Sequence, residues 1–387
     1  MECYLDNAAT TQVLPEVCEI VTKVMREEYG NPSSLHMKGV EGERFVRKAA
    51  EQVAKTLKCK PQNIIFTSGG TESNNMALFG VSEAAKRKGR HIVTTCFEHP
   101  SVHEPLIFLE NQGYEVTYLP VNDKGHVEPE VLRDALREDT VLVSVMMVNN
   151  EVGSLLNVAE LSHLVKAYRE EIVFHVDAIQ AYGKRKIHPR KMGIDVLSVS
   201  GHKIHGPKGV GFLYRADGVK MQPLLYGGGQ QAGMRSGTEN VPGIAGLGLA
   251  AEIMDETMEQ RSLEMYQRKQ QLMELLTEVP GVTINACGKL PLEETAPHIL
   301  SASFDGVRSE VLLHALEERE IYVSSGSACS SNHPGISGTL RAIGVPEALL
   351  DSTLRFSISA FTQPEEIEYT VECLKSLVPE LARYRRM

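Results

Sequence analysis

Short apolar and β-branched runs alternate with longer amphipathic segments between about residue 63 and residue 214. This alternation is typical of strand–helix–strand units that build a mostly parallel sheet flanked by helices. The pattern therefore predicts an α/β fold. The expected strands cover residues 64–67, 91–94, 116–119, 141–145, 173–176, 196–199 and 210–213.

The glycines at 227–229 and the stretch up to Gly248 interrupt this rhythm, and a long polar helix is expected over about 253–278. We place a domain boundary here, because 387 residues are too many for one ordinary domain. The expected division is a large domain of residues 12–252 and a smaller α+β domain of residues 1–11 and 253–387. Its expected elements are strands over 299–304, 321–323 and 354–358, a helix over 310–318 and a closing helix from residue 365.

The bulk composition is that of a globular protein. Hydrophobic residues make up 42% of the chain and charged residues 23%, and no apolar run approaches the roughly 18 residues that a membrane span needs. The net charge of −10 disfavours sequence-independent binding to nucleic acid or binding to an anionic membrane surface. The first residues, Met1 to Asp6, lack the features of an export signal. We expect a soluble, cytoplasmic protein that contacts neither nucleic acid nor membrane directly.

The seven cysteines are odd in number, widely spaced and without a C-x-x-C pair. This predicts neither a disulfide framework nor a structural zinc site. For most of them we expect reduced, buried, apolar side chains.

Two segments that follow strands have features of a ligand site. Residues 67–75, TSGGTESNN, lead from a strand into a helix, where free backbone N–H groups and glycines suit a phosphate. A tight turn capped by Thr71 or Ser68 explains the same residues equally well. Asp177 follows the strand that ends at residue 176, where ligands meet parallel sheets, and its carboxylate could pair with a protonated pyridine nitrogen. The alternative for Asp177 is a helix cap.

Lys203 follows a third strand, within residues 198–209, SVSGHKIHGPKG. A lysine among small and aromatic residues can be desolvated and form an imine. A lone lysine is more often solvated, but a phosphate loop, an acid and a lysine on successive strand ends favour one shared site.

These motifs resemble those of a known family. The chain looks like the cysteine desulfurases of the NifS/IscS type, in the class V branch of fold-type I pyridoxal phosphate (PLP) enzymes, from residue 4 to about residue 380. The segments that carry the resemblance are 5–11, 29–34, 68–73, 98–99, 149–153, 175–180, 200–203, 235–240, 324–330 and 354–357.

The resemblance implies a PLP site and a homodimer. Lys203 would bond to the cofactor and move the substrate α-proton, while His99 would stack on the ring and could exchange a proton with the substrate thiol or product. His99 also has the plainer interpretation of a capping histidine. Thr238 would reach the phosphate of the neighbouring subunit's cofactor, and Arg355 would bind the substrate carboxylate. The remaining implied contacts are Asp177 to the pyridine nitrogen, Gln180 to the ring oxygen, Gly70, Thr71, Ser200 and His202 to the phosphate, and Asn150 and Asn31 near the substrate.

Cys329 is implied as the thiolate that takes sulfur from L-cysteine, leaving L-alanine and a persulfide. It lies in the small, polar stretch 323–335, which we expect to form an exposed mobile loop. His333 could ease thiolate formation, although a solvated histidine is the commoner role. The sulfur would pass to an iron–sulfur scaffold, a tRNA-thiolating enzyme or another carrier. No metal site is expected beyond a transient iron–sulfur ligand at Cys329.

Two features depart from the family pattern. Glu320 stands where relatives commonly have glycine after a helix, so either a strained residue or a changed helix end is expected. The sequence ends at Met387 without the longer tail of some relatives, which leaves the sulfur acceptor open. The alternatives are a selenocysteine lyase, another class V aminotransferase, or a non-catalytic protein that keeps the fold.

Overall fold

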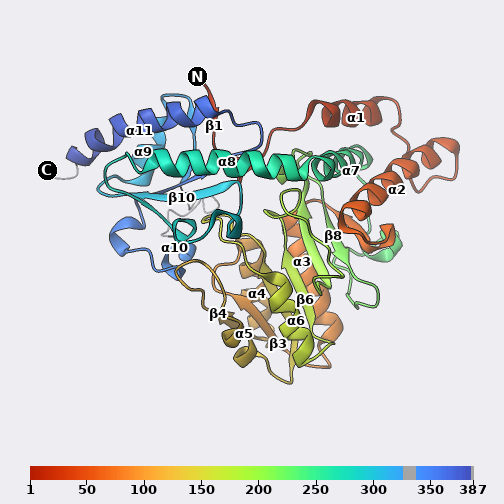
Figure 1. Ribbon diagram of the computed structural model, residues 1–387. Coiled ribbons are helices and arrows are strands. Elements are labelled where there is room, and N and C mark those ends of the chain that lie inside the picture. Colours follow the sequence, from red (N-terminus) through yellow and green to blue (C-terminus); the bar gives the residue numbers. More distant parts are fainter. Residues whose placement is uncertain (326–336, 385–387) are drawn as a thin grey trace.

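The computed structural model describes residues 1–325 and 337–384, which form a large sheet and a small sheet with helices around both (Figure 1). Among these residues the large sheet has seven strands in the order β2-β8-β7-β6-β5-β3-β4. Only β8 runs antiparallel to its neighbours, so the mostly parallel sheet predicted from the sequence is confirmed. Its strands are β2 (Ile64–Thr67), β3 (His91–Thr95), β4 (Glu115–Leu119), β5 (Thr140–Met146), β6 (Val173–Asp177), β7 (Val196–Ser200) and β8 (Gly211–Arg215).

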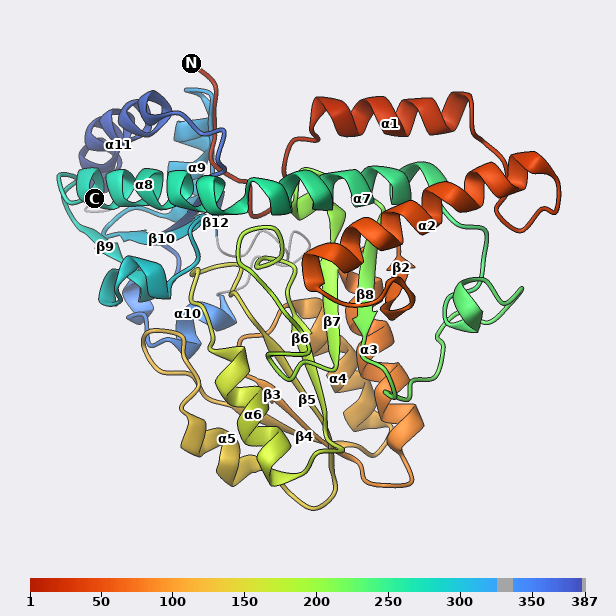
Figure 2. The same cartoon turned by 45° about the vertical axis from the view of Figure 1, so that its right-hand side comes forward.

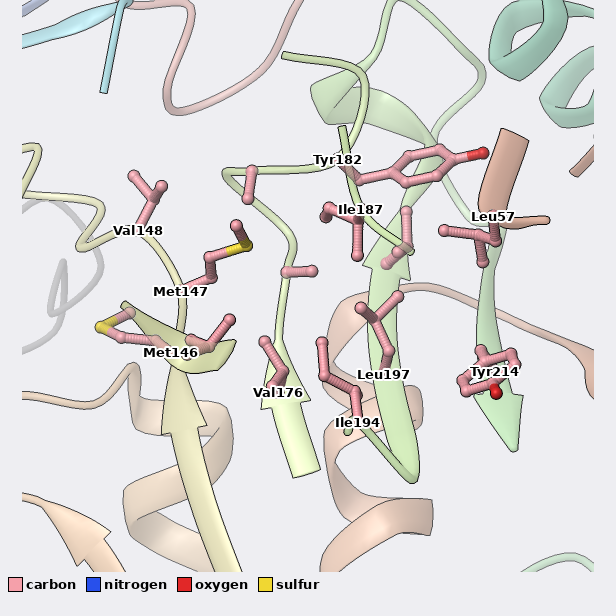
Figure 3. Close-up of a cluster of buried hydrophobic side chains, with 14 of the residues drawn as sticks. Leu57, Met146, Met147, Val148, Val176, Tyr182, Ile187, Ile194, Leu197 and Tyr214 are labelled. Atoms are coloured by element: carbon pink, nitrogen blue, oxygen red, sulfur yellow. The ribbon is translucent and has the colours of Figure 1, made fainter. Parts of the chain in front are cut away.

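Helices cover both faces of this sheet. One face packs against α3 (Gly70–Ala85) and α4 (Pro100–Asn111) through Met76, Val81 and Leu106. The opposite face lies under α1 (Pro15–Arg26), α2 (Met37–Leu57), α5 (Pro129–Ala135), α6 (Val158–Tyr168) and α7 (Val241–Glu256). Figure 3 shows part of the core on this face of the large sheet, where Val176 and Leu197 on neighbouring strands lie close to Ile187 and Ile194.

A second core surrounds the small sheet, which has the order β12-β13-β10-β9. The N-terminal segment returns to this core, because β1 pairs with β11 in parallel and buries Cys3 and Leu5 there. The elements are β1 (Cys3–Tyr4), β9 (Val282–Ile284), β10 (Ile299–Phe304), β11 (Ile321–Tyr322), β12 (Ser324–Ser325), β13 (Thr353–Ser357), α8 (Met258–Leu276), α9 (Ser309–Glu317), α10 (Gly338–Ala342) and α11 (Pro364–Tyr384).

The interpretation of the stretch up to Gly248 as a break is wrong, because α7 begins at Val241 and includes its glycines. A Cβ on Gly246 would lie 2.7 Å from Val21 Cγ2, and one on Gly248 2.6 Å from Ala49 Cα. These glycines therefore allow close helix packing. Helices α7 and α8 follow one another above both cores (Figure 2). The single long helix expected over 253–278 is instead the end of α7 and the whole of α8, which meet at Thr257. The domain boundary at residue 252 stays a prediction.

Glu320 has a φ of 61°, so it keeps the left-handed conformation that favours glycine instead of changing the chain path. Its carbonyl accepts the backbone N–H of Cys3 at 2.8 Å, which joins this turn to β1. None of the helices in residues 1–325 and 337–384 has the length and apolar run needed to cross a membrane.

Candidate active site

The predicted site residues gather where the strands of the large sheet end. Asp177 and Ser200 are the last residues of β6 and β7, His99 follows β3, and Asn150 follows β5. Strand β2 ends just before Gly70, the first residue of α3. Carboxyl ends of parallel strands share one edge, so the topology brings these segments together.

A chain of hydrogen bonds runs across this edge. Asn74, on the first turns of α3, donates from Nδ2 to Asp177 Oδ2 (2.8 Å) and to Ser101 Oγ (2.9 Å). Ser101 contacts His99 Nδ1 through its hydroxyl (2.8 Å) and donates its backbone N–H to the same nitrogen (3.1 Å). Because Nδ1 accepts, a neutral His99 ring carries its proton on Nε2. His99 therefore caps α4, as the plainer interpretation expected, and its ring orientation is also fixed.

Burial shifts the pKa of the two side chains at the ends of this series of hydrogen bonds, Asp177 and His99. It raises the pKa of Asp177, although the Ile179 N–H, His99, Asn74 and Lys203 oppose the shift. It lowers the pKa of His99, an effect that Asp177 opposes and Lys203 reinforces. Asp177 is thus a buried carboxylate that a cationic ligand would stabilise.

Lys203 ends a 3₁₀ turn, Gly201–Lys203, directly after β7. Its Nζ donates to the carbonyls of Ala8 and Ala9, the latter at 2.7 Å. Gln180 Nε2 donates to the Ala8 carbonyl as well, at 2.9 Å. The N-terminal segment therefore covers the lysine, which no sequence motif predicted.

The start of α3 fits a phosphate. Its N-cap is Gly69, and no side chain caps the helix, so the alternative of a cap by Thr71 or Ser68 is wrong. A Cβ on Gly70 would lie 2.3 Å from Ile179 Cδ1 and 3.6 Å from Ser200 Cβ, so only glycine allows this close approach. Uncapped N–H groups at a helix start favour an anion.

His202 completes the same end of the site, with its Nδ1 3.2 Å from Thr10 Oγ1. Burial and nearby lysines lower its pKa to about 4, so the ring is neutral near pH 7. The uncapped helix start, the buried Asp177 and the nearby Lys203 fit the phosphate, ring nitrogen and aldehyde of PLP.

Arg355, on β13, reaches the site from the small sheet. Its Nη2 donates to Asp6 Oδ1 at 2.7 Å and its Nη1 to the Asn150 carbonyl at 2.9 Å. Nε is buried without a partner among the described residues. The two contacts of Nη1 and Nη2 hold the guanidinium in place, as recognition of a carboxylate requires.

Several functional candidates escaped the sequence reasoning. Asn74 and Asp6 lie within the quoted motifs, yet only the fold shows what they hold. Lys184 is a buried lysine that donates to the Lys203 carbonyl at 2.9 Å, and burial lowers its pKa to about 7. Glu98 is buried beside this edge, and burial raises its pKa to about 8. Spacing along the chain carries no signal for burial of these charged side chains.

Some of the predicted site residues lie apart from this cluster in the single chain. Asn31 and Thr238 are exposed, on the segment between α1 and α2 and on the segment before α7. Cys329 and His333 lie outside the described residues. The expectation that the other cysteines are buried is wrong for Cys18 and Cys96, which are exposed.

Comparisons with known proteins agree with this geometry. The family model described as aminotransferase class-V matches residues 3–370. A protein named cysteine desulfurase IscS, from Dictyoglomus turgidum, is 43% identical over 384 residues, which cover 98% of this chain and 95% of that protein. The solved structure of a NifS-like protein has a TM-score of 0.92 and 38% identity, covering 98% and 100% of the two chains. The structure titled SspA in complex with cysteine has a TM-score of 0.81 and 31% identity, covering 93% and 100%.

Proposed function

Because the chain belongs to the aminotransferase class-V family, among its cysteine desulfurases, we propose that it takes sulfur from L-cysteine onto Cys329 with PLP as its cofactor. The observation that carries this proposal is the joining of Asp177, Lys203 and Arg355 at one sheet edge. An acid for the ring nitrogen, an amine for the aldehyde and an arginine for the substrate carboxylate suit an amino acid substrate.

PLP, when bound, supplies an electron sink for the electrons left on the substrate α-carbon. Asp177 would pair with the ring nitrogen and favour its protonated form, which maintains that sink. Lys203 Nζ would act as the general base that takes the substrate α-proton. The Ala8 and Ala9 carbonyls that accept from Nζ offer the freed amine a defined position.

Because His99 Nδ1 accepts hydrogen bonds, its neutral ring carries the proton on Nε2, and this Nε2–H would serve as the proton donor to the substrate thiol or product. Arg355 would orient the substrate carboxylate through its guanidinium. Gln180 Oε1 lies 3.1 Å from His298 Nε2, and this contact holds the amide that would bond to the ring oxygen.

Sulfur transfer then balances without an outside oxidant. Cys329 Sγ forms a bond to the substrate sulfur, the Cβ–S bond breaks, and its electron pair stays with carbon, which takes up a proton. Cysteine and a thiol become alanine and a persulfide. The persulfide then passes to a protein acceptor with a reactive cysteine, for iron–sulfur cluster assembly or thiolation of cofactors or tRNA.

The test is incubation with cysteine under reducing conditions, with alanine and sulfide measured. Wild type should release both in equal amounts, Cys329→Ala should release neither, and Cys96→Ala, which alters an exposed cysteine near the same edge, should match wild type. Equal sulfide from wild type and Cys329→Ala would contradict the proposal. Release of selenide from selenocysteine with cysteine untouched would identify a selenocysteine lyase instead.

We also propose a homodimer. Tyr29, Leu35, Met37 and Tyr226 are large apolar side chains that are exposed in the single chain, and such groups mark interaction surfaces. Tyr29 and Leu35 lie on the segment between α1 and α2, Met37 is the first residue of α2, and Tyr226 lies on the segment before α7. The two segments project on the same side in Figures 1 and 2. Thr238 belongs to the second segment. Sedimentation should give twice the chain mass of 42.7 kDa, and a monomer at micromolar concentration would contradict this.

A further inference from the structure

An acidic side chain stands at the proposed phosphate site. Glu72 lies in the first turn of α3, and its Oε2 accepts the backbone N–H of Ser68 at 2.7 Å, so the carboxylate folds back over the loop that leads into the helix. Gly70, which allows the close approach expected of a phosphate, lies between these two residues. A helix start attracts an anion, but two anions held close together repel one another. Glu72 would therefore oppose a bound phosphate unless its charge is balanced.

Arg235 supplies the balancing charge. Its Nε donates to Glu72 Oε1 at 2.8 Å and its Nη2 donates to Glu72 Oε2 at 3.3 Å, the paired geometry in which a guanidinium binds a carboxylate. The Arg235 side chain is 23% exposed and the Glu72 side chain 14%, so solvent screens the pair only in part. Burial raises the pKa of Glu72, but the contacts with Arg235 and Ser68 outweigh it and the pKa is lowered. Glu72 is therefore ionised near pH 7, with Arg235 as its ion-pair partner.

The chain around Arg235 is fixed to the strand that leads into the same loop. Gln231 Oε1 accepts the Phe66 N–H at 2.6 Å, and Gln231 Nε2 donates to the Phe66 carbonyl at 2.8 Å. Phe66 lies on β2, an edge strand of the large sheet, so the Gln231 amide bonds to backbone groups that a further strand would otherwise use. These two hydrogen bonds hold the segment that carries Arg235 beside the start of α3.

We propose that Arg235 is a positioning residue for the phosphate site: it holds and neutralises Glu72, so that the start of α3 can accept the phosphate of the cofactor as a second anion. Arg235 acts through Glu72 and contacts neither the substrate nor the cofactor ring in this account. This inference rests on the proposed use of PLP. It predicts that Arg235 matters for a ligand with a phosphate and not for the same ligand without one.

The test compares two ligands that differ in the phosphate. PLP and pyridoxal share the ring and the aldehyde that would bond to Lys203, but pyridoxal carries no phosphate. Binding of each to the full-length protein, freed of cofactor by dialysis, is measured from the absorbance of the lysine-bound aldehyde. The variants are Arg235→Ala, Glu72→Gln and the two combined. The control is Arg308→Ala, because Arg308, just before α9, makes an exposed pair with Glu310 at 3.7 Å.

Arg235→Ala should weaken PLP binding about tenfold, because it leaves Glu72 unpaired beside the phosphate, and should change pyridoxal binding less than about twofold. Glu72→Gln keeps an acceptor oxygen for the Ser68 N–H without the charge, so it should bind PLP at least as tightly as wild type. The combined variant should recover PLP affinity to within about threefold of wild type, since both charges of one pair are removed together. Arg308→Ala should match wild type with both ligands.

Equal PLP affinity in wild type and Arg235→Ala would overturn the proposal, as would an equal loss of affinity for PLP and pyridoxal. If Arg235 acted only by supporting the fold, or through Thr238 on the same segment, the combined variant would bind PLP as weakly as Arg235→Ala, and this result would overturn it too.

If Arg235→Ala does not fold, Glu72→Gln decides alone. PLP binding as tight as in wild type or tighter supports the proposal, and weaker PLP binding overturns it. A wild-type protein that binds neither PLP nor pyridoxal would instead refute the proposed cofactor on which this inference rests, so the two failures are distinguishable.

Discussion

The proposed cofactor side and the proposed substrate side of the site are held together in different ways. On the cofactor side, Asp177, Asn74 and His99 stand at strand ends or helix starts of one sheet and are joined by short hydrogen bonds. On the substrate side, Arg355 binds Asp6 across 349 positions of sequence and the Asn150 carbonyl across 205. The first side forms with the large sheet, whereas the second forms only when distant segments meet. Substitutions on the cofactor side should therefore reduce the rate of the reaction most. Substitutions on the substrate side should mainly change the binding and positioning of the substrate.

The largest effect should follow from Lys203→Ala. Loss of the amine removes both the attachment of the cofactor and the base for the α-proton, so alanine formation should fall about 1,000-fold or more. The measurement is the rate of alanine formation, with borohydride trapping and mass analysis as a check on the cofactor bond. A Lys203→Ala variant that keeps a tenth of the wild-type activity would contradict the assignment of these two roles to Lys203.

The second largest effect should come from removing the charge of Asp177. Asp177→Asn keeps the shape but not the charge that supports the ring nitrogen, so kcat should fall about 100-fold or more. Asn74→Ala removes one hydrogen bond to that carboxylate and should cost about tenfold. Steady-state kinetics give both values, and equal losses in the two variants would contradict the ranking.

On the substrate side the effect should appear in KM. Arg355→Lys loses the planar fork that binds a carboxylate, so KM for cysteine should rise about 100-fold. Asp6→Asn weakens the contact that orients Arg355 and should raise KM about tenfold, with kcat nearly kept. A fall in kcat with KM unchanged, in either variant, would place Arg355 outside substrate binding.

The smallest effect on activity, and a clear one on stability, is expected from Glu98→Gln. The acid holds its proton to about pH 8 when folded, against an ordinary value of 4.5. Between these values the folded state binds more protons than the unfolded state, so the stability of the wild type falls as pH rises; below pH 4.5 both states are protonated and the slope vanishes.

Glutamine at position 98 does not titrate, so it removes this dependence of the unfolding free energy on pH. The unfolding free energy of Glu98→Gln relative to wild type should therefore gain about 1.4 kcal/mol per pH unit from pH 5.5 to 7.5. Urea unfolding at several pH values within this range measures it. A difference that stays constant with pH would mean that Glu98 is ionised in the folded protein.

The same contrast explains what could be predicted from sequence. The strands and the ligand residues at their ends follow local rules of periodicity and turns, so Asp177 and Lys203 stood out. The helix from Val241 was missed because glycines that permit close packing look like a break when their neighbours are unknown. Asp6 and Glu72 depend on partners far along the chain, and no spacing rule reveals such pairs.

The most direct test of the central claim is to locate the sulfur after one turnover without reductant. Wild-type enzyme given one equivalent of cysteine should yield one alanine per chain and one added sulfur on the peptide that contains Cys329, with the Cys96 peptide unchanged. Sulfur on another cysteine, or alanine formed with no sulfur bound to the protein, would contradict the account.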